Sequence, residues 1–298
     1  MLGSYTAAQS VRRGEGGWET YAAYSAHPVE LPGCRMIQLD IRDPGSVSDA
    51  MAEIRPDVVI HSAAAVRPDA CEQQKADAFG INVLGTYNVL AAAKQVSAHL
   101  VHVSTDLVFN GEHNPFRPED PVCPVNYYGL TKAAAEAAVV TADTDWAIVR
   151  TTTLYGPRMF PNLNSFSDKV IESLRSGQPV LGYVDEYRPS VPVWNVADVL
   201  LEIAERRLTG IYHAVSPDVT TRYQFARKIA EAFGLDESLI KPVSMAEAGV
   251  IALRPKVLIL DISETASTLT TRLLGFEEGI RELLKRQEWC RGWDHPAL

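Results

Sequence analysis

The chain has 298 residues, of which 46% are hydrophobic, and a formal net charge of −9. This is enough apolar material for one large domain or two modest ones. The charge balance shows no basic stripe, and phosphate contacts need clustered lysine and arginine, so we expect no binding to nucleic acid. No apolar run reaches the roughly 18 residues of a membrane helix, and we expect no membrane association.

The cysteine pattern indicates neither a disulfide framework nor a metal site. The four cysteines are far apart and lack CxxC or Cys/His ligand spacing: Cys34, Cys71, Cys123 and Cys290. We therefore expect reduced thiols in a cytoplasmic protein. The N-terminal stretch 2–11 is amphipathic and is followed, not preceded, by Arg12 and Arg13, which is not typical of a signal peptide.

Short apolar runs alternate with amphipathic stretches over the first half of the chain. The apolar runs predict strands at 19–24, 36–39, 57–62, 100–104 and 146–150. The amphipathic stretches predict helices at 46–54, 78–95 and 128–140, with Asp43 or Ser46 capping the first. Strands separated by helices form a parallel sheet covered on both faces. We therefore predict an α/β, doubly wound, Rossmann-like fold, whose ligands bind at the carboxyl ends of the strands.

The second half of the chain is less regular. We expect a loop at 157–164 and helices at 166–176, 223–233 and 279–286, the second of which ends at Gly234. The segments 191–201 and 210–214 are expected to rejoin the first domain. The prediction is a dinucleotide-binding domain at 1–155 and a smaller substrate-binding lobe at 156–298, with about 191–215 returning to the nucleotide domain.

Tyr128 and Lys132 are four positions apart in a predicted helix, so they share one face. A phenol has an ordinary pKa of about 10, and a cation within ~4–6 Å lowers it. Tyr128 would then exchange a proton with a carbonyl oxygen, and Lys132 would also hold a cofactor ribose. Tyr223 and Arg227 have the same spacing, so the spacing alone assigns no function.

A predicted strand ends in hydroxyl residues ahead of this helix. Ser104 and Thr105 follow the apolar run that begins at Leu100. A hydroxyl at the carboxyl end of such a strand faces the ligand crevice, where Thr105 would orient a substrate oxygen toward Tyr128. The alternative is that both hydroxyls only cap the turn.

Seven segments spread over most of the chain together resemble the extended short-chain dehydrogenase/reductases that act on sugar nucleotides, and most of all the dTDP-4-dehydrorhamnose reductase family. They are D-I-R-D (40–43), R-P-D-V-V-I-H-S-A-A-A (55–65), N-V-L-G-T (82–86), V-S-T-D-L-V-F-N-G (103–111), P-V-N-Y-Y-G-L-T-K (124–132), R-T-T-T-L-Y-G (150–156) and R-P-K-V-L-I-L-D (254–261).

The resemblance implies that Thr105, Tyr128 and Lys132 form a catalytic triad. The other residues that it places around the cofactor are Gly3, Asp40, Ile41, Ala63, Ala64, Ala65 and Ser104. The residues expected to contact the substrate are Thr105, Asp106, Leu107, Thr153 and Arg188. From the sequence itself, Asp40 would equally well cap the following helix, and Asn82, implied as support for the site, would equally well be an ordinary helix amide.

Two positions depart from the pattern on the side of the sugar. The reductases of the resembled family carry an aromatic residue at Leu107 and a tryptophan at Thr153. The loss of two aromatic surfaces puts a rhamnose-type substrate in doubt. The related dehydratases have Asp-Glu after the threonine, whereas here Leu107 follows Asp106, which argues against elimination of water.

The start of the chain departs further. The family opens with a strand and GxxGxxG, and here Gly3 corresponds only to the last glycine of that motif. Gly14, Gly16 and Gly17 follow the first amphipathic stretch and are expected in a helix end and loop. We expect the natural protein to begin about ten residues upstream, with an apolar strand and two more glycines, and the chain as given to bind cofactor poorly.

The sequence thus predicts an enzyme that reduces a keto group on a nucleotide-linked sugar with NADP(H) or NAD(H), of the kind used in dTDP-rhamnose biosynthesis, and a possible homodimer. Residues 25–28 after the first strand include no acidic side chain, so NADPH should be accepted at least as well as NADH. Two alternatives are a non-catalytic relative like the regulatory subunit of methionine adenosyltransferase, which binds a partner enzyme, and a sugar-nucleotide epimerase.

Overall fold

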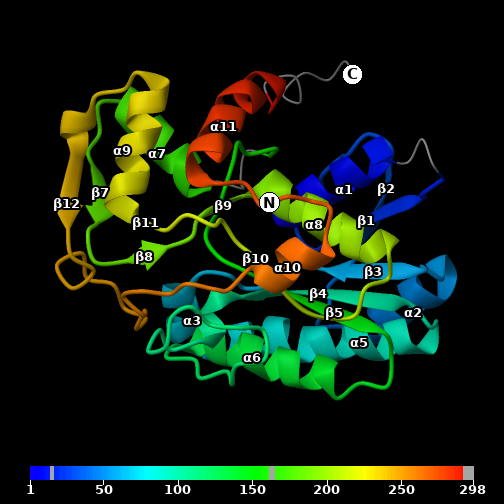
Figure 1. The fold of residues 1–298 in the computed structure, drawn as a ribbon. Coiled ribbons are helices and arrows are strands. Elements are labelled where there is room, and N and C mark those ends of the chain that lie inside the picture. The colour runs from blue at the N-terminus through cyan, green and yellow to red at the C-terminus, as the bar shows by residue number, and fades with distance from the viewer. Residues whose placement is uncertain (14–16, 161–164, 291–298) are drawn as a thin grey trace.

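The computed structural model describes residues 1–13, 17–160 and 165–290. A four-stranded parallel sheet lies at its centre (Figure 1). Its strands, in spatial order, are β10 (Gly210–Ala214), β5 (Trp146–Thr151), β4 (His99–Thr105) and β3 (Val58–His61). The predicted α/β fold with a parallel sheet is therefore confirmed.

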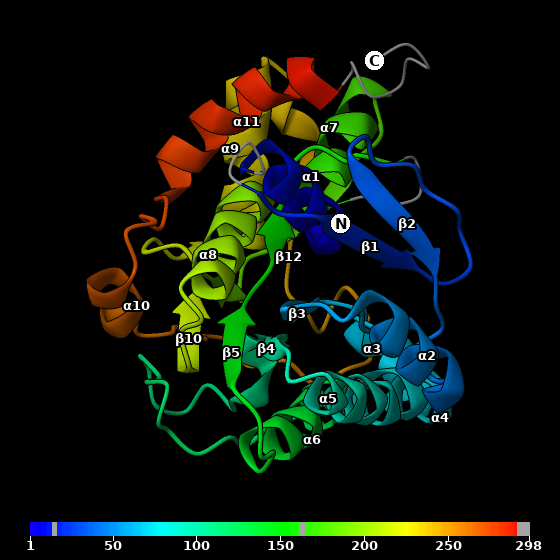
Figure 2. The ribbon, with the colours of Figure 1, turned by 90° about the vertical axis from the view of Figure 1, so that its right-hand side faces the viewer.

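Helices cover both faces of this sheet (Figures 1 and 2). On one face lie α5 (Gly85–Gln95) and α6 (Tyr127–Val140), and on the other lies α8 (Val193–Glu205). The strands carry apolar side chains on both faces for this reason, and Leu100, Val101 and Ile148 are completely buried. Helix α1 (Leu2–Arg13) packs on the outer side of α8.

A second parallel pair lies beside the sheet (Figure 2). It consists of β1 (Thr20–Tyr24) and β2 (Cys34–Gln38), and β1 forms no ladder with β3 in the part of the chain that is described. The chain then enters α2 (Pro44–Ile54), which packs on α5. Asp43 caps α2 by accepting hydrogen bonds from the backbone N–H groups of Gly45 and Ser46, so of the two expected caps Asp43 is correct.

The predicted helix at 78–95 is three pieces. After α3 (Pro68–Gln73), α4 (Lys75–Phe79) is followed by a π-helical turn over 80–84 and then by α5. The Asn82 side chain links this turn to two other segments of the chain. Its amide oxygen accepts a hydrogen bond from the backbone N–H of Ala65 at 2.7 Å, and its amide nitrogen donates one to Thr131 Oγ1 at 2.9 Å. A π-turn of this kind commonly marks a functional site, and it ties α5 to the loop after β3.

The remaining elements form a smaller lobe over the carboxyl ends of the sheet (Figure 1). Its helices are α7 (Phe166–Arg175), α9 (Arg222–Phe233) and α11 (Phe276–Cys290), with α10 (Ser263–Thr268) beside β10. The strand pairs are β6 (Leu154–Tyr155) with β9 (Val191–Pro192), β7 (Val180–Tyr183) with β12 (Ile240–Val243), and β8 (Tyr187–Arg188) with β11 (Thr220–Thr221).

In this lobe the helices were predicted from the sequence more accurately than the strands. Helix α9 ends at Gly234, whose φ of 62° is in the left-handed region, as predicted. The short strand pairs were not predicted, because two to four residues carry too little pattern. Positions 161–164 of the expected loop lie outside the described residues. None of the helices in the described part is long and apolar enough to cross a membrane.

Candidate active site

A cleft of about 1410 Å³ opens at the carboxyl ends of β3, β4 and β5 and continues between β1 and β3. It is the place where open parallel sheets bind their ligands. The structure brings twelve of the fourteen sequence-predicted site residues to its wall: Gly3, Ile41, Ala63, Ala64, Ser104, Thr105, Asp106, Leu107, Tyr128, Lys132, Thr153 and Arg188. The two that do not line it are Asp40 and Ala65.

Tyr128 is set by the start of α6. Asn126 caps the helix by accepting from the backbone N–H of Gly129 at 2.8 Å. Position 129 must be glycine, because a Cβ there would collide with the backbone carbonyl of Leu107. The close approach packs the first turn of α6 against the end of β4, and this brings the Tyr128 phenol to the Thr105 hydroxyl.

The electrostatic expectation for Tyr128 was wrong. Burial raises the pKa of the phenol above its ordinary value, the hydrogen bond with Thr105 opposes this, and the nearby Asp106 and Cys71 raise it further. The sequence had predicted a lowered pKa from the Lys132 ammonium. Burial disfavours the charged phenolate, and this effect outweighs the stabilisation that was expected from Lys132. Tyr128 is therefore protonated at neutral pH.

Lys132 shares the helix face with Tyr128 but bonds elsewhere. Its Nζ lies 3.0 Å from Nε2 of His102, the histidine at the middle of β4, and both side chains are buried. Burial lowers the pKa of Lys132 to about 8, while Glu136 acts in the opposite direction. The phenol and ammonium that were expected to be direct neighbours are therefore held by different partners.

Asp106 is the centre of a buried polar network on the cleft wall. Its carboxylate accepts hydrogen bonds from Thr105 Oγ1 at 3.1 Å and Thr152 Oγ1 at 2.8 Å. It also forms an ion pair with Arg188 of β8 at 3.1 Å, in which both side chains are 5% exposed. This pair connects the end of β4 to the smaller lobe and fixes the Thr105 hydroxyl.

Small residues line the side of the cleft that the family resemblance assigned to the cofactor. Gly3 at the start of α1 lies so close to Ser62 that a Cβ would be 2.9 Å from the Ser62 hydroxyl. Ser104 Oγ is buried without a hydrogen-bond partner among the described residues, at the carboxyl end of β4. Ala65 does not line the cleft wall. Its backbone N–H and C=O both form hydrogen bonds with the Asn82 side chain. Asn82 thus supports the loop 63–65 and is not merely an ordinary helix amide.

Asp40 does not have the capping role that was one of its two predicted roles. Its exposed carboxylate forms an ion pair with Arg42 at 2.6 Å, and this pairing holds the pKa of Asp40 below its ordinary value. It does not cap α2, since Asp43 does. Ile41 lines the cleft and touches Gly85, where a Cβ would be 2.6 Å from the Ile41 side chain.

Most of the charged cleft wall that the smaller lobe contributes was not predicted from the sequence. Glu186 binds Arg222 at 2.8 Å and lies 3.6 Å from Arg188. Burial alone would raise the pKa of Glu186, but Arg222 and Arg188 lower it below its ordinary value. Other cleft residues not predicted are His61, Thr151, Thr152, Ser165, Phe166, Lys169 and Arg254. Arg254 belongs to the quoted R-P-K segment, which was the one available signal for this wall.

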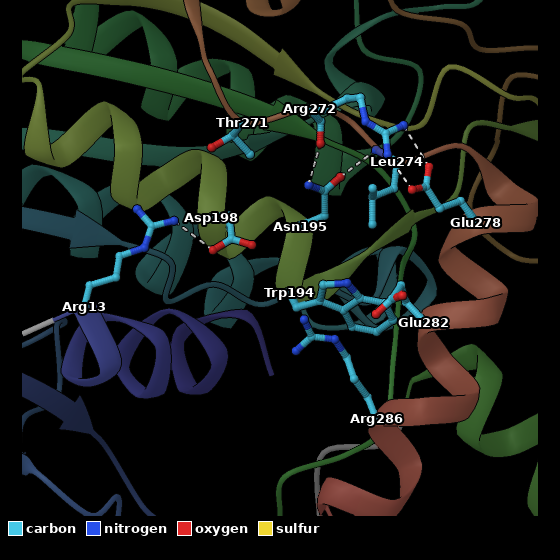
Figure 3. Close-up of a pocket in the computed structure, with 10 residues that line it drawn as sticks. All are labelled: Arg13, Trp194, Asn195, Asp198, Thr271, Arg272, Leu274, Glu278, Glu282 and Arg286. Carbon is cyan, nitrogen blue, oxygen red and sulfur yellow. Dashed lines mark hydrogen bonds and ion pairs between the residues drawn. The ribbon is translucent and has the colours of Figure 1, made fainter.

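A second, shallower pocket of about 450 Å³ lies between α1, α8 and α11, away from the sheet ends (Figure 3). Its cations are engaged: Arg13 pairs with Asp198, and Arg272 pairs with Glu278. Arg286 lies over the Trp194 ring at 4.8 Å. These contacts join α11 and α1 to α8, and we assign the pocket no chemistry. The described ranges hold no cluster suited to a metal ion, and Cys34, Cys71 and Cys123 are free thiols.

The parallel sheet and the cleft at its carboxyl ends define an α/β protein with the architecture of the extended short-chain dehydrogenase/reductases. The family model described as "RmlD substrate binding domain" matches residues 12–288. The chain belongs to this family.

Individual relatives fall into two groups. Methionine adenosyltransferase 2 subunit beta of Xenopus tropicalis is 31% identical over 285 residues, which cover 90% of this chain and 84% of that protein. "Probable low-salt glycan biosynthesis reductase Agl14" of Haloferax volcanii is 32% identical over 253 residues, 84% of each chain. The crystal structure of dTDP-4-dehydrorhamnose reductase from Bacillus anthracis with NADP has a TM-score of 0.78 and 28% identity, covering 85% of this chain and 90% of that one.

Proposed function

We propose that the protein reduces a keto group on a nucleotide-linked sugar, using NADPH or NADH. The observation that carries the proposal is the placement of Tyr128 and Thr105 together on the wall of the large cleft, where β4 ends. Tyr128 would donate the proton, and the Thr105 hydroxyl beside it would orient the substrate oxygen. Both lie in the crevice where this fold binds nucleotides.

The residues of the cleft fit a nicotinamide cofactor. Ser104 Oγ is a buried hydroxyl without a partner among the described residues, and Ala63, Ala64 and Gly3 leave the adjoining wall free of bulky side chains. A related dTDP-4-dehydrorhamnose reductase was solved with NADP. When bound, the cofactor supplies the hydride, and Lys132 and Ser104 are the side chains that would hold it.

The protonation state of Tyr128 suits it to act as the acid when a keto group is reduced. A buried phenol whose pKa is raised keeps its proton at neutral pH, so it is prepared to donate to a carbonyl oxygen that is gaining charge. Thr105 is held by Asp106, which Arg188 and Thr152 hold in turn. This network fixes the position of the orienting hydroxyl, which favours proton transfer.

Turnover with a defined substrate tests the proposal. The protein should oxidise NADPH in the presence of a dTDP-linked 4-keto-6-deoxy sugar, and the sugar should gain two hydrogens by mass spectrometry. The same mixture without sugar is the control. Absence of turnover with dTDP- and UDP-linked 4-keto sugars, by a protein that binds NADPH in calorimetry, would contradict the proposal.

A second candidate is a binding subunit, favoured by the 31% identity to methionine adenosyltransferase 2 subunit beta. The pairing of Lys132 with His102, away from the phenol, is compatible with a site that binds a nucleotide without turning it over. Sedimentation of the chain with a methionine adenosyltransferase catalytic subunit tests this candidate. A stable complex would support it, and two independent boundaries would exclude it for that partner.

A further inference from the structure

We propose that His102 is a positioning residue for Lys132: its imidazole accepts a hydrogen bond from the buried ammonium and holds the side chain, charged, against β4. The catalytic meaning of this contact rests on the proposed reductase function, but the contact itself does not.

The geometry of the pair is specific. His102 Nε2 is 3.0 Å from Lys132 Nζ, and the two side chains come from β4 and α6, which pack directly on one another. His102 is 0% exposed and Lys132 is 2% exposed. No other hydrogen bond of the Lys132 ammonium is found within the described residues. A buried cation needs an acceptor, and here the imidazole supplies it.

The surroundings keep His102 neutral. The titratable and charged groups around the pair are His61 from β3 and Glu136 from α6, which is bonded to Arg150 of β5. Burial, then the charge of Lys132 and then His61 lower the pKa of His102 well below its ordinary value. A neutral imidazole has one nitrogen free to accept, so the ammonium is the donor.

The contact also fixes which nitrogen carries the proton. If Nε2 accepts from Lys132, the proton of His102 is on Nδ1, which is buried and finds no partner within the described residues. The ring of His61 lies 5.3 Å away, centroid to centroid, and its Nε2 is engaged with Thr86 Oγ1 at 3.1 Å. The choice of tautomer therefore depends on Lys132, and it is measurable without any substitution.

Nuclear magnetic resonance of the whole protein tests the proposal in two ways. With ¹⁵N-histidine, His102 of the unsubstituted protein should show the Nδ1–H tautomer near neutral pH, and an Nε2–H tautomer or a charged ring would overturn the proposal. With ¹³Cε-lysine, the Lys132 resonance is assigned by its loss in Lys132→Met, and its titration midpoint is expected near pH 8.

Three variants separate the hydrogen bond from general packing. In His102→Leu the midpoint should fall by about one to two pH units, which is the worth of a hydrogen bond to a charged group. In His102→Gln, which keeps an acceptor, it should stay within about half a unit. His99→Leu, the same change on the same strand at a buried histidine with no contact to Lys132, should leave it unchanged.

An unchanged midpoint in His102→Leu, or an equal fall in His102→Gln, would overturn the assignment. If His102→Leu does not fold, the tautomer measurement decides. Neither readout uses turnover, so a protein that reduces no sugar would defeat the proposed function and leave this test intact. Where turnover exists, the pH at which kcat changes should move with the Lys132 midpoint.

Discussion

His61 should make the protein lose stability as the pH falls below about 6.5. Burial and then the charge of Lys132 lower the pKa of His61 from 6.5 to about 3 in the folded chain. Below pH 6.5 the unfolded chain binds a proton at this histidine and the folded chain does not, so protonation favours unfolding. The contribution of His61 is therefore lost progressively between about pH 6.5 and pH 3.

The size of the effect follows from the same shift. Each pH unit within this window corresponds to about 1.4 kcal/mol. Between pH 7 and pH 5 the cost at His61 is about 2 kcal/mol, after allowing for partial protonation of the unfolded chain at pH 7. This is a large part of the ~5–15 kcal/mol that stabilises a typical domain.

Urea unfolding of the wild-type chain and of His61→Asn at both pH values isolates this term. Carboxylates that gain protons affect both proteins equally, so they cancel in the comparison. The wild type should lose about 2 kcal/mol more than His61→Asn between pH 7 and pH 5. A difference between the two proteins that is the same at pH 7 and pH 5 would refute the reasoning.

Three other predictions concern the ion pair, the lysine and the cofactor. Glu136→Ala leaves the buried Arg150 guanidinium without its carboxylate, 2.8 Å away, and should cost about 3–5 kcal/mol in urea unfolding; a cost below about 1 kcal/mol would contradict this. Lys132→Met removes a buried cation whose pKa is lowered from 10.5 to about 8, so at pH 7 it should stabilise the fold by about 3 kcal/mol while turnover is lost. An unchanged melting temperature would speak against that penalty. NADPH should bind at least as tightly as NADH, and calorimetry showing clearly tighter NADH would overturn the inference from residues 25–28.

The elements of the first half of the chain were predicted well because their sequence signals are local. Apolar runs of five or six residues predicted β3, β4 and β5, and one of the two predicted caps, Asp43, begins α2, which starts two residues earlier than predicted. The π-helical turn was missed because its cause is tertiary. Asn82 reaches back to Ala65 and across to Thr131, contacts that no helical periodicity records.

Most residues of the candidate site were predicted from the sequence, but their hydrogen-bond partners and protonation states were not. Motifs named Thr105, Tyr128 and Lys132, and the structure places all three at one cleft. Which partner Lys132 selects depends on His102 of the adjoining strand β4, and the protonation state of Tyr128 depends on its burial. Glu186 and Arg222 are 36 positions apart and come together because β8 pairs with β11, the strand that precedes α9. Their spacing in the sequence therefore does not predict the ion pair.

Replacement of the Tyr128 phenol tests the proposed chemistry most directly. Tyr128→Phe removes the transferable proton and keeps the ring, so the fold and NADPH affinity should be unchanged. Turnover of a nucleotide-linked 4-keto sugar should fall by the ~10²–10⁴-fold expected of a general acid. A variant that keeps more than about a tenth of the wild-type kcat would contradict the assignment of Tyr128 as the proton donor.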